Sequence, residues 1–145
     1  MAKITLRPVI PPDLPILFEQ QLEPEAVAMS AYPSKDRGEF IRHWEGILKN
    51  KAIVARTIIY KEKIAGHIIY WKEGKYEQRV GYWIGKQFWG RGIATSALKD
   101  FLAGVKIRPL YAEVANHNLA SRKVLEKNGF TLLDEGPKTS MYKLN

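Results

Sequence analysis

The chain has 145 residues, of which 23 are Lys or Arg and 15 are Asp or Glu, so its formal net charge is +8. Its apolar share of 46% and charged share of 26% are typical of a globular domain and exclude a disordered chain. The absence of cysteine excludes disulfides, thiolate metal sites and a cysteine nucleophile, and no stretch approaches the roughly 18 apolar residues of a membrane span. We therefore expect one cytoplasmic domain over residues 1–145, with no signal peptide and no membrane partner.

The first fifty residues predict one strand and two helices. Residues 4–7 alternate apolar and polar side chains, as a strand does, and the proline-rich residues 11–21 begin a helix. Residues 35–49 repeat apolar side chains at helical spacing, with Ser34 as the expected N-cap.

The next segment predicts antiparallel strands. Residues 51–60 and 64–71 are rich in β-branched and aromatic side chains, and the three residues between them suit a hairpin turn. Gly74 marks a second turn, after which residues 79–84 form another strand.

The last third alternates helices and strands. A helix is predicted over residues 92–103, a strand over 109–114, and a second helix over 118–128 between an Asn118 N-cap and a Gly129 C-cap. Two short strands follow, at 130–133 and 140–144. This order predicts a single mixed domain of the α+β (α/β) class.

The positive charge is uneven. Residues 1–50 hold six Lys or Arg against seven Asp or Glu, whereas residues 51–145 hold seventeen against eight. Such an excess indicates either a solvated basic surface or an anionic partner, namely nucleic acid or a phosphorylated ligand.

A glycine loop is the most informative segment. Gly90 and Gly92 follow a strand and open directly into the helix at 92–103, which is the arrangement of an anion site at a helix N-terminus. No Gly-Lys-Ser/Thr ending is present, and Thr95 takes the third glycine position of a dinucleotide fingerprint, so both of those motifs fit poorly. Two glycines that merely make a tight turn remain an alternative.

The loop also resembles a known family. Gln87-Phe88-Trp89-Gly90-Arg91-Gly92, followed by Ile93-Ala94, resembles the Q/R-x-x-G-x-G/A signature of the GNAT superfamily of N-acetyltransferases. Residues 81–84 and 118–130 fall in the same family order, most similar to the branch of ribosomal-protein N-terminal acetyltransferases, and the resemblance covers residues 51–133. It implies a mixed, mostly antiparallel sheet of six or seven strands with flanking helices. The central strands, 79–85 and 110–114, would splay around acetyl-CoA.

The resemblance implies a coenzyme site. Strand 79–85 would pair with the pantetheine arm, a backbone N–H among residues 83–85 would polarise the thioester carbonyl, and residues 89–94 would hold the pyrophosphate. Arg91 would contact a phosphate and Asn118 the pantetheine chain. The full implied set is Trp83, Ile84, Gly85, Gln87, Trp89, Gly90, Arg91, Gly92, Ile93, Ala94, Thr95, Asn118 and Ser121.

Two residues are expected to move protons. Glu113 matches a glutamate that serves as base in part of the ribosomal branch; its alternatives are a simple ion pair, or a water wire that takes the proton in its place. The family's usual proton donor is a tyrosine, and Leu125 stands at that position, so the resemblance assigns the role to Ser121. The alternative for Ser121 is a hydroxyl that satisfies a backbone group in the first turn of the helix. A thiolate with a pKa of about 8.5 can also leave unaided. His67 and His117 are weaker candidates, expected to be structural or surface residues.

The acceptor end is less specific. Tyr32, Trp71 and Tyr82 are the candidate acceptor-binding residues, whereas Trp44 is expected in the core. The predicted reaction is direct acetyl transfer from acetyl-CoA to a primary amine, either a protein N-terminus or a small molecule, by a monomer or homodimer without a metal. The alternatives are a non-catalytic acyl-CoA-binding domain and a basic nucleic-acid-binding domain; we expect no nucleic-acid partner.

Overall fold

The computed structural model describes residues 2–31, 34–74 and 77–145. Its elements are β1 (Thr5–Pro8), a 3-10 turn (Pro11–Asp13), α1 (Leu14–Gln20), α2 (Pro24–Met29), α3 (Arg37–Lys49), β2 (Val54–Tyr60), β3 (Lys63–Glu73), β4 (Glu77–Ile84), a 3-10 turn (Lys86–Phe88), α4 (Ile93–Gly104), β5 (Leu110–Ala115), α5 (Leu119–Lys127), β6 (Thr131–Glu135) and β7 (Thr139–Leu144). None of the helices in the described ranges is long and apolar enough to span a membrane.

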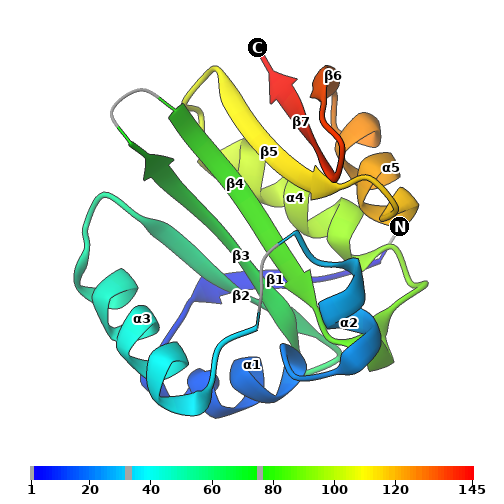
Figure 1. The fold of residues 1–145 in the computed structure, drawn as a ribbon. Coiled ribbons are helices and arrows are strands. Elements are labelled where there is room, and N and C mark those ends of the chain that lie inside the picture. Colours follow the sequence, from blue (N-terminus) through cyan, green and yellow to red (C-terminus); the bar gives the residue numbers. More distant parts are fainter. Residues whose placement is uncertain (1, 32–33, 75–76) are drawn as a thin grey trace.

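The strands form one seven-stranded sheet in the order β1-β2-β3-β4-β5-β7-β6 (Figure 1). All neighbours are antiparallel except β4 and β5, which are parallel and pair only at Arg79 with Tyr111. Beyond that pair the two central strands diverge. The predicted mixed, mostly antiparallel sheet with splayed central strands is therefore confirmed.

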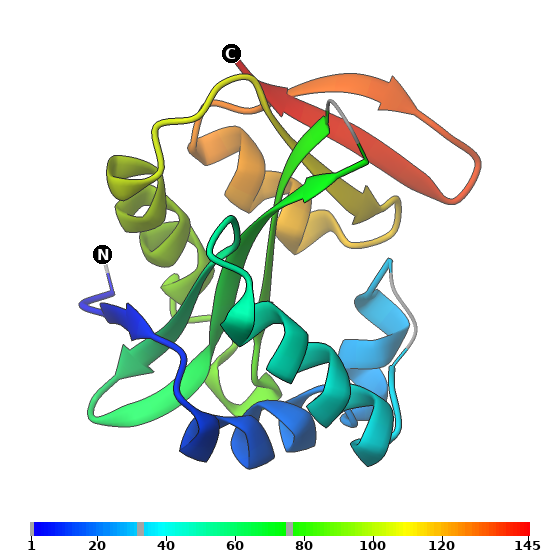
Figure 2. The same ribbon diagram turned by 90° about the vertical axis from the view of Figure 1, so that its left-hand side faces the viewer.

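Helices cover both faces of the sheet, and Figure 2 shows α3 and α4 on opposite sides. On the α4 face, Ile68 and Tyr70 of β3 join the larger core with Leu98 and Phe101 of α4. On the other face, Ile69 packs against the smaller core of α1 and α3, which includes Phe18, Phe40 and Trp44. Because side chains alternate along a strand, β3 serves both cores. The predicted core position of Trp44 is confirmed.

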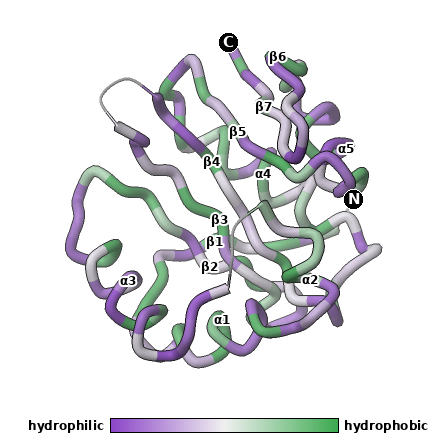
Figure 3. Tube along the Cα trace, viewed as in Figure 1, coloured by the Kyte–Doolittle hydropathy of each residue, from purple (hydrophilic) through white to green (hydrophobic). Residues whose placement is uncertain are grey.

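The start of α3 differs from the prediction. Asp36, rather than Ser34, is the N-cap: its carboxylate accepts from the Glu39 N–H at 2.8 Å, and the Glu39 carboxylate accepts from the Asp36 N–H at 3.4 Å. This reciprocal capping box satisfies two backbone donors, which a serine two residues earlier cannot reach. Purple and green segments alternate along α3 in Figure 3, as expected for an amphipathic helix with one face on the core.

Helix α2 was not predicted, because its six residues are too few to show a helical period. Pro24 supplies the first turn and the Glu23 carboxylate accepts from the Ala26 N–H at 2.9 Å, so local capping defines this helix. The element matters because it borders the cavity described below.

A buried carboxylate ties β1, the first 3-10 turn and β2 together. Asp13 is 2% exposed and accepts two hydrogen bonds from Arg7, at 2.7 and 2.9 Å, one from Thr57 Oγ1 at 2.8 Å and one from the Ile10 N–H at 3.0 Å. Burial alone raises the pKa of Asp13, but the hydrogen bonds from Arg7, Ile10 and Thr57 outweigh burial and hold the pKa below its usual value.

The close approach of β3 and β4 at Gly66 yields a stability prediction. A Cβ at Gly66 would lie 1.9 Å from the Trp83 carbonyl oxygen and 3.0 Å from Ile84 Cα, both backbone atoms. We expect Gly66→Ala to lower the free energy of unfolding by about 1–3 kcal/mol in urea denaturation, because the strands must move apart. Gly46→Ala is the matched control, because Gly46 lies inside α3 and a Cβ there would meet no atom within 4 Å. This variant should raise the free energy of unfolding by about 0.5–1 kcal/mol. Equal effects of the two changes would contradict the prediction.

Candidate functional site

A cavity of about 710 Å³ opens where β4 and β5 diverge, bordered by α2, α5 and the loop before α4. Most of the residues predicted for the site line this cavity: Trp71, Tyr82, Trp83, Ile84, Trp89, Gly90, Gly92, Ile93, Ala94, Thr95, Glu113, Asn118 and Ser121. Gly85, Gln87 and Arg91 do not line it. Tyr32 lies outside the described residues.

The edge of β4 that faces the gap carries unusual backbone groups. The Gly85 N–H donates to the Ala65 carbonyl of β3 at 2.8 Å, so Gly85 and Trp83 direct their backbone groups toward β3. Because these groups alternate along a strand, those of Tyr82 and Ile84 face the gap. The N–H expected to reach a ligand among residues 83–85 is therefore that of Ile84. The Ile84 carbonyl accepts from Trp89 Nε1 at 2.9 Å, which closes this end of the gap.

Helix α4 begins without a side-chain cap. Gly90 and Gly92 have φ values of +76° and +74°, and Gly92 is the N-cap. By contrast, α2, α3 and α5 each begin with a side chain that accepts from a first-turn N–H, from Glu23, Asp36 and Asn118 respectively. The first amides of α4 thus face the cavity with the positive end of the helix dipole behind them, which suits an anion.

Arg91, the expected phosphate contact, lies beside the main cavity rather than on its wall. It borders a separate hollow of about 140 Å³ together with Tyr60, Lys61, Lys63 and Phe88. Gln87 is exposed on the 3-10 turn. Gln87 precedes the glycine loop and Arg91 lies within it, and neither residue lines the larger cavity.

Asn118 links two elements across the cavity. Its Oδ1 accepts from the Ser121 N–H at 3.1 Å, which confirms the predicted N-cap, and its Nδ2 donates to the Met29 carbonyl at 3.1 Å. The neighbouring His117 ring contacts the Ala28 carbonyl. These contacts tie the end of α2 to the turn between β5 and α5.

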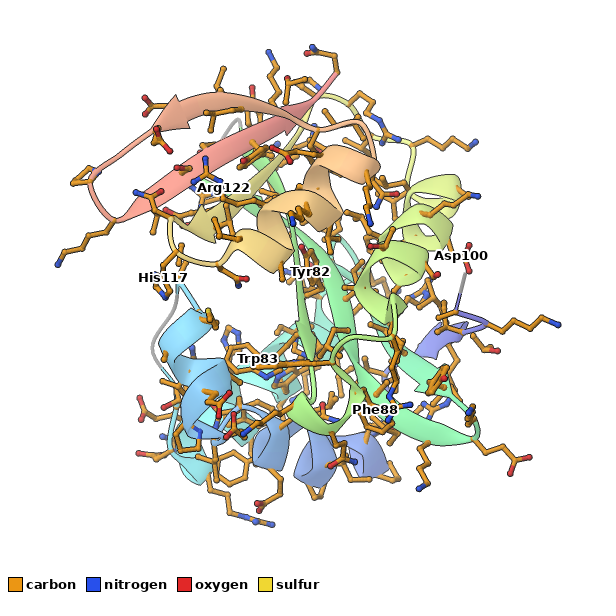
Figure 4. The ribbon with its side chains drawn as sticks, turned by 90° about the vertical axis from the view of Figure 1, so that its right-hand side faces the viewer. Tyr82, Trp83, Phe88, Asp100, His117 and Arg122 are labelled. Carbon is orange, nitrogen blue, oxygen red and sulfur yellow. The ribbon has the colours of Figure 1, made fainter. Side chains whose placement is uncertain are left out.

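A tyrosine hydroxyl does reach the α5 side of the cavity, but from β4. Tyr82 Oη lies 2.6 Å from Ser121 Oγ and 3.3 Å from the Ser121 carbonyl oxygen, and Figure 4 shows Tyr82 beside α5. Burial raises the pKa of Tyr82 to about 12, with the hydrogen bond to Ser121 acting in the opposite direction. Leu125 is 1% exposed in the core. The sequence did not predict this pair, because its members are 39 residues apart.

Glu113 is both ion-paired and part of the cavity wall. Its carboxylate accepts from Arg79 Nη1 at 3.4 Å and from Thr139 Oγ1 at 3.0 Å, and its side chain is 25% exposed. Arg79 also contacts Glu77, at 3.2 Å. Ala112 and Val114 point into the α4-side core, so Glu113 lies on the opposite face of β5.

Aromatic side chains occupy that same face. The His67 ring lies 5.0 Å from the Trp44 ring, edge to face, and Trp83 Nε1 donates to the Gln20 carbonyl of α1 at 3.1 Å. Burial lowers the pKa of His67 to about 4, so the ring is neutral near neutral pH. The Trp71 indole lies over Gly81: a Cβ at Gly81 would be 3.3 Å from Cζ3 of the indole ring.

Charged side chains near the cavity are largely paired with one another. Lys86 contacts Glu25 at 2.8 Å and Glu23 at 3.5 Å, and Arg122 contacts Glu135 at 3.0 Å. Among residues 2–31, 34–74 and 77–145, no group of three or more His, Asp or Glu side chains is placed to hold a metal ion.

Comparison with known proteins gives a family match. The model of the acetyltransferase (GNAT) domain family matches residues 3–131, whereas no match was found among curated protein sequences. The structure is similar to an acetyltransferase from Thermus thermophilus, with a TM-score of 0.81, 24% identity, and coverage of 98% of this chain and 96% of that one.

Two further solved structures are similar at lower identity. One is the Salmonella typhimurium acetyl transferase that modifies the N-terminal serine of ribosomal protein L7/L12 (TM-score 0.82, 21% identity, 99% and 95% coverage). The other is the microcin C7 self-immunity acetyltransferase MccE, in complex with acetyl-CoA and AMP (TM-score 0.78, 21% identity, 98% and 92% coverage). With the family model spanning nearly all of the chain, the resemblance in the glycine loop is confirmed, and the protein belongs to the acetyltransferase (GNAT) domain family.

Proposed function

We propose that this protein transfers an acetyl group from acetyl-CoA to a primary amine, with both substrates bound at once. The observation that carries the proposal is the gap between β4 and β5, which pair at a single residue pair and open onto the uncapped start of α4. The MccE structure, which contains acetyl-CoA, supports the choice of donor. We further propose that residues 1–145 act as a single domain in the cytoplasm.

The donor fits the groups that the gap presents. A pantetheine arm carries amides that can pair with the backbone edge of β4 at Tyr82 and Ile84, as an added strand does. A pyrophosphate suits the first-turn amides of α4, because Gly92 offers no side chain to compete for them. Arg91, which borders the hollow beside the main cavity, is proposed to contact a phosphate from there. Asn118 is proposed to contact pantetheine. Its Nδ2, which donates to the Met29 carbonyl in this structure, would then donate to the ligand instead.

The proposed reaction forms one bond and breaks one. The amine nitrogen attacks the thioester carbonyl carbon, whose oxygen is polarised by the Ile84 N–H, and the carbon–sulfur bond then breaks. Glu113 takes the proton that the amine loses, directly or through water. The coenzyme A thiolate takes a proton from Ser121, whose hydroxyl is reprotonated from water while Glu113 returns its proton to water, so the products are an N-acetyl amide and a free thiol.

Tyr82 is proposed to orient that proton. Each hydroxyl carries one proton, and the phenol lies closer to Ser121 Oγ, at 2.6 Å, than to the Ser121 carbonyl, at 3.3 Å. When Tyr82 donates to Ser121 Oγ, the serine proton is left to point into the gap. The phenol thereby compensates for the apolar side chain at Leu125.

Donor binding is tested by thermal denaturation and turnover by thiol release. If the Kd is about 10 μM, about 1 mM acetyl-CoA should stabilise the fold by about 2.7 kcal/mol, whereas acetate at the same concentration should not. Free thiol should then appear on addition of a reactive amine. Absence of any shift contradicts the coenzyme site, and a shift without thiol release across an amine panel favours an acyl-CoA-binding domain without turnover.

A further inference from the structure

The face of the sheet opposite α4 gives the cavity an aromatic, apolar wall. We call this the acceptor wall and define it by His67, Ile69 and Trp71 of β3, Gly81 and Trp83 of β4, and Met29 of α2. The contact of His67 with Trp44 and that of Trp83 with Gln20 place these strand residues on the α1 and α3 face. Tyr82 and the start of α4 lie on the other face. A donor whose pyrophosphate lies at the start of α4 enters the gap from the α4 face, so an acceptor that meets it approaches across this wall.

The acceptor wall offers little negative charge. Among the described residues that line the cavity, Glu113 is the single Asp, Glu, Lys or Arg. Its carboxylate is already engaged with Arg79 and Thr139. His67 is neutral near neutral pH because of its burial. Three neighbouring carboxylates lie outside the lining: Glu73 accepts from Trp71 Nε1 at 2.8 Å, and Glu23 and Glu25 contact Lys86.

We propose that the acceptor is an amine with one positive charge on an apolar alkyl or aryl body, and that diamines, polyamines and aminoglycosides are rejected. The inference rests on the proposed acetyl transfer. An apolar body gains by leaving water against Trp71, Trp83 and Ile69, while the reacting amine faces Glu113. A second ammonium would leave water where the described lining offers no carboxylate other than Glu113, because the Glu73 carboxylate lies outside the lining and already accepts from Trp71 Nε1. Stacking of that ammonium on an indole returns only part of the cost.

Matched amines test the charge rule. We expect butylamine to have a kcat/KM on the order of 100-fold above that of 1,4-diaminobutane, which has the same chain and one more ammonium. We expect 2-phenylethylamine to exceed butylamine because its ring buries more apolar surface. Equal or faster acetylation of 1,4-diaminobutane, or of an aminoglycoside, would overturn the proposal.

Peptides separate the two sources of such an amine. A Phe-Gly-Gly amide carries one charge and an aromatic first residue, and a Lys-Gly-Gly amide carries two charges. Preference for the first peptide over the second supports the charge rule. If Phe-Gly-Gly amide is acetylated faster than 2-phenylethylamine, the natural acceptor is a polypeptide N-terminus. The reverse order indicates a small-molecule amine. Preference for the lysine peptide overturns the rule.

A tryptophan pair provides matched variants. Trp71→Ala should lower kcat/KM for 2-phenylethylamine by about tenfold, lower that for butylamine less, and leave the thermal shift with acetyl-CoA unchanged. Trp89→Ala removes an indole at the donor end, so it should weaken acetyl-CoA binding and leave the ratio between the two amines unchanged. A Trp71→Ala variant that keeps the wild-type ratio would overturn the acceptor wall.

Failure of this inference is distinguishable from failure of the proposed function. Thiol release that is faster with amines of two or more positive charges than with monoamines counts against the acceptor wall alone. An acetyl-CoA thermal shift without thiol release from any of these amines counts against the transferase itself, and the acceptor proposal falls with it.

Discussion

Replacing Glu113 with glutamine should lower kcat near neutral pH by about 10²–10⁴-fold, with a smaller loss at high pH. Alkylamines have pKa values of about 10, so nearly all of the acceptor arrives protonated and a base is needed to produce the nucleophile. At high pH the amine deprotonates without help. The measurement is the pH–rate profile of both forms with a monoamine acceptor.

Glu77→Gln is the control for this prediction. Glu77 contacts the same Arg79 guanidinium, at 3.2 Å, but does not line the cavity. If Glu113 acts as the base, only its own replacement alters the pH dependence. An unchanged profile in Glu113→Gln would remove Glu113 from the base role and leave the ion pair as its function, with a water wire in its place.

Asp13→Ala should lower the free energy of unfolding by about 3–5 kcal/mol, measured by urea denaturation. The variant leaves the buried Thr57 hydroxyl and the Ile10 N–H without the carboxylate that accepts their hydrogen bonds, and it leaves Arg7 without its partner. Asp100→Ala is the control, because Asp100 is exposed on α4 (Figure 4). A surface change of this kind is expected within about 0.5 kcal/mol of wild type.

The contribution of Asp13 should also depend on pH. Because folding lowers the pKa of Asp13 below its usual value, its stabilisation is fully present above the pKa of the unfolded chain, about 3.9. The stabilisation is lost as the pH falls through the folded-state pKa. The difference between wild type and Asp13→Asn should therefore shrink in acid. A difference that is constant between neutral pH and about pH 3 would contradict the charged network.

Local signals account for what the sequence predicted well. Gly90 and Gly92 between a strand and a helix, and Asn118 at the start of the next helix, are defined by neighbours a few residues away, and both helices begin where expected. The alternation of β3 likewise predicted a strand, although not that it serves two cores.

What the sequence did not reveal depends on contacts between distant segments. Side-chain periodicity does not reveal that the Gly85 N–H donates to the Ala65 carbonyl, and this bond narrows the expected carbonyl contact within residues 83–85 to Ile84. The meeting of Tyr82 with Ser121, across 39 residues, depends on how β4 and α5 pack. The motif predicts an arginine beside the phosphate. It does not predict that Arg91 borders a hollow with Tyr60, Lys61 and Lys63 of the β2–β3 hairpin.

The single residue pair between β4 and β5 also affects how the fold holds together. Elsewhere in the sheet, rows of backbone hydrogen bonds join neighbouring strands, whereas here β1–β4 and β5–β7–β6 are connected mainly by side chains of the α4-side core, such as Val80, Leu98 and Leu110. The cooperativity of unfolding between the two halves therefore depends on packing rather than on the backbone ladder. A donor lying along the edge of β4 would act as an eighth strand, so that substrate binding and mechanical closure of the sheet become one event.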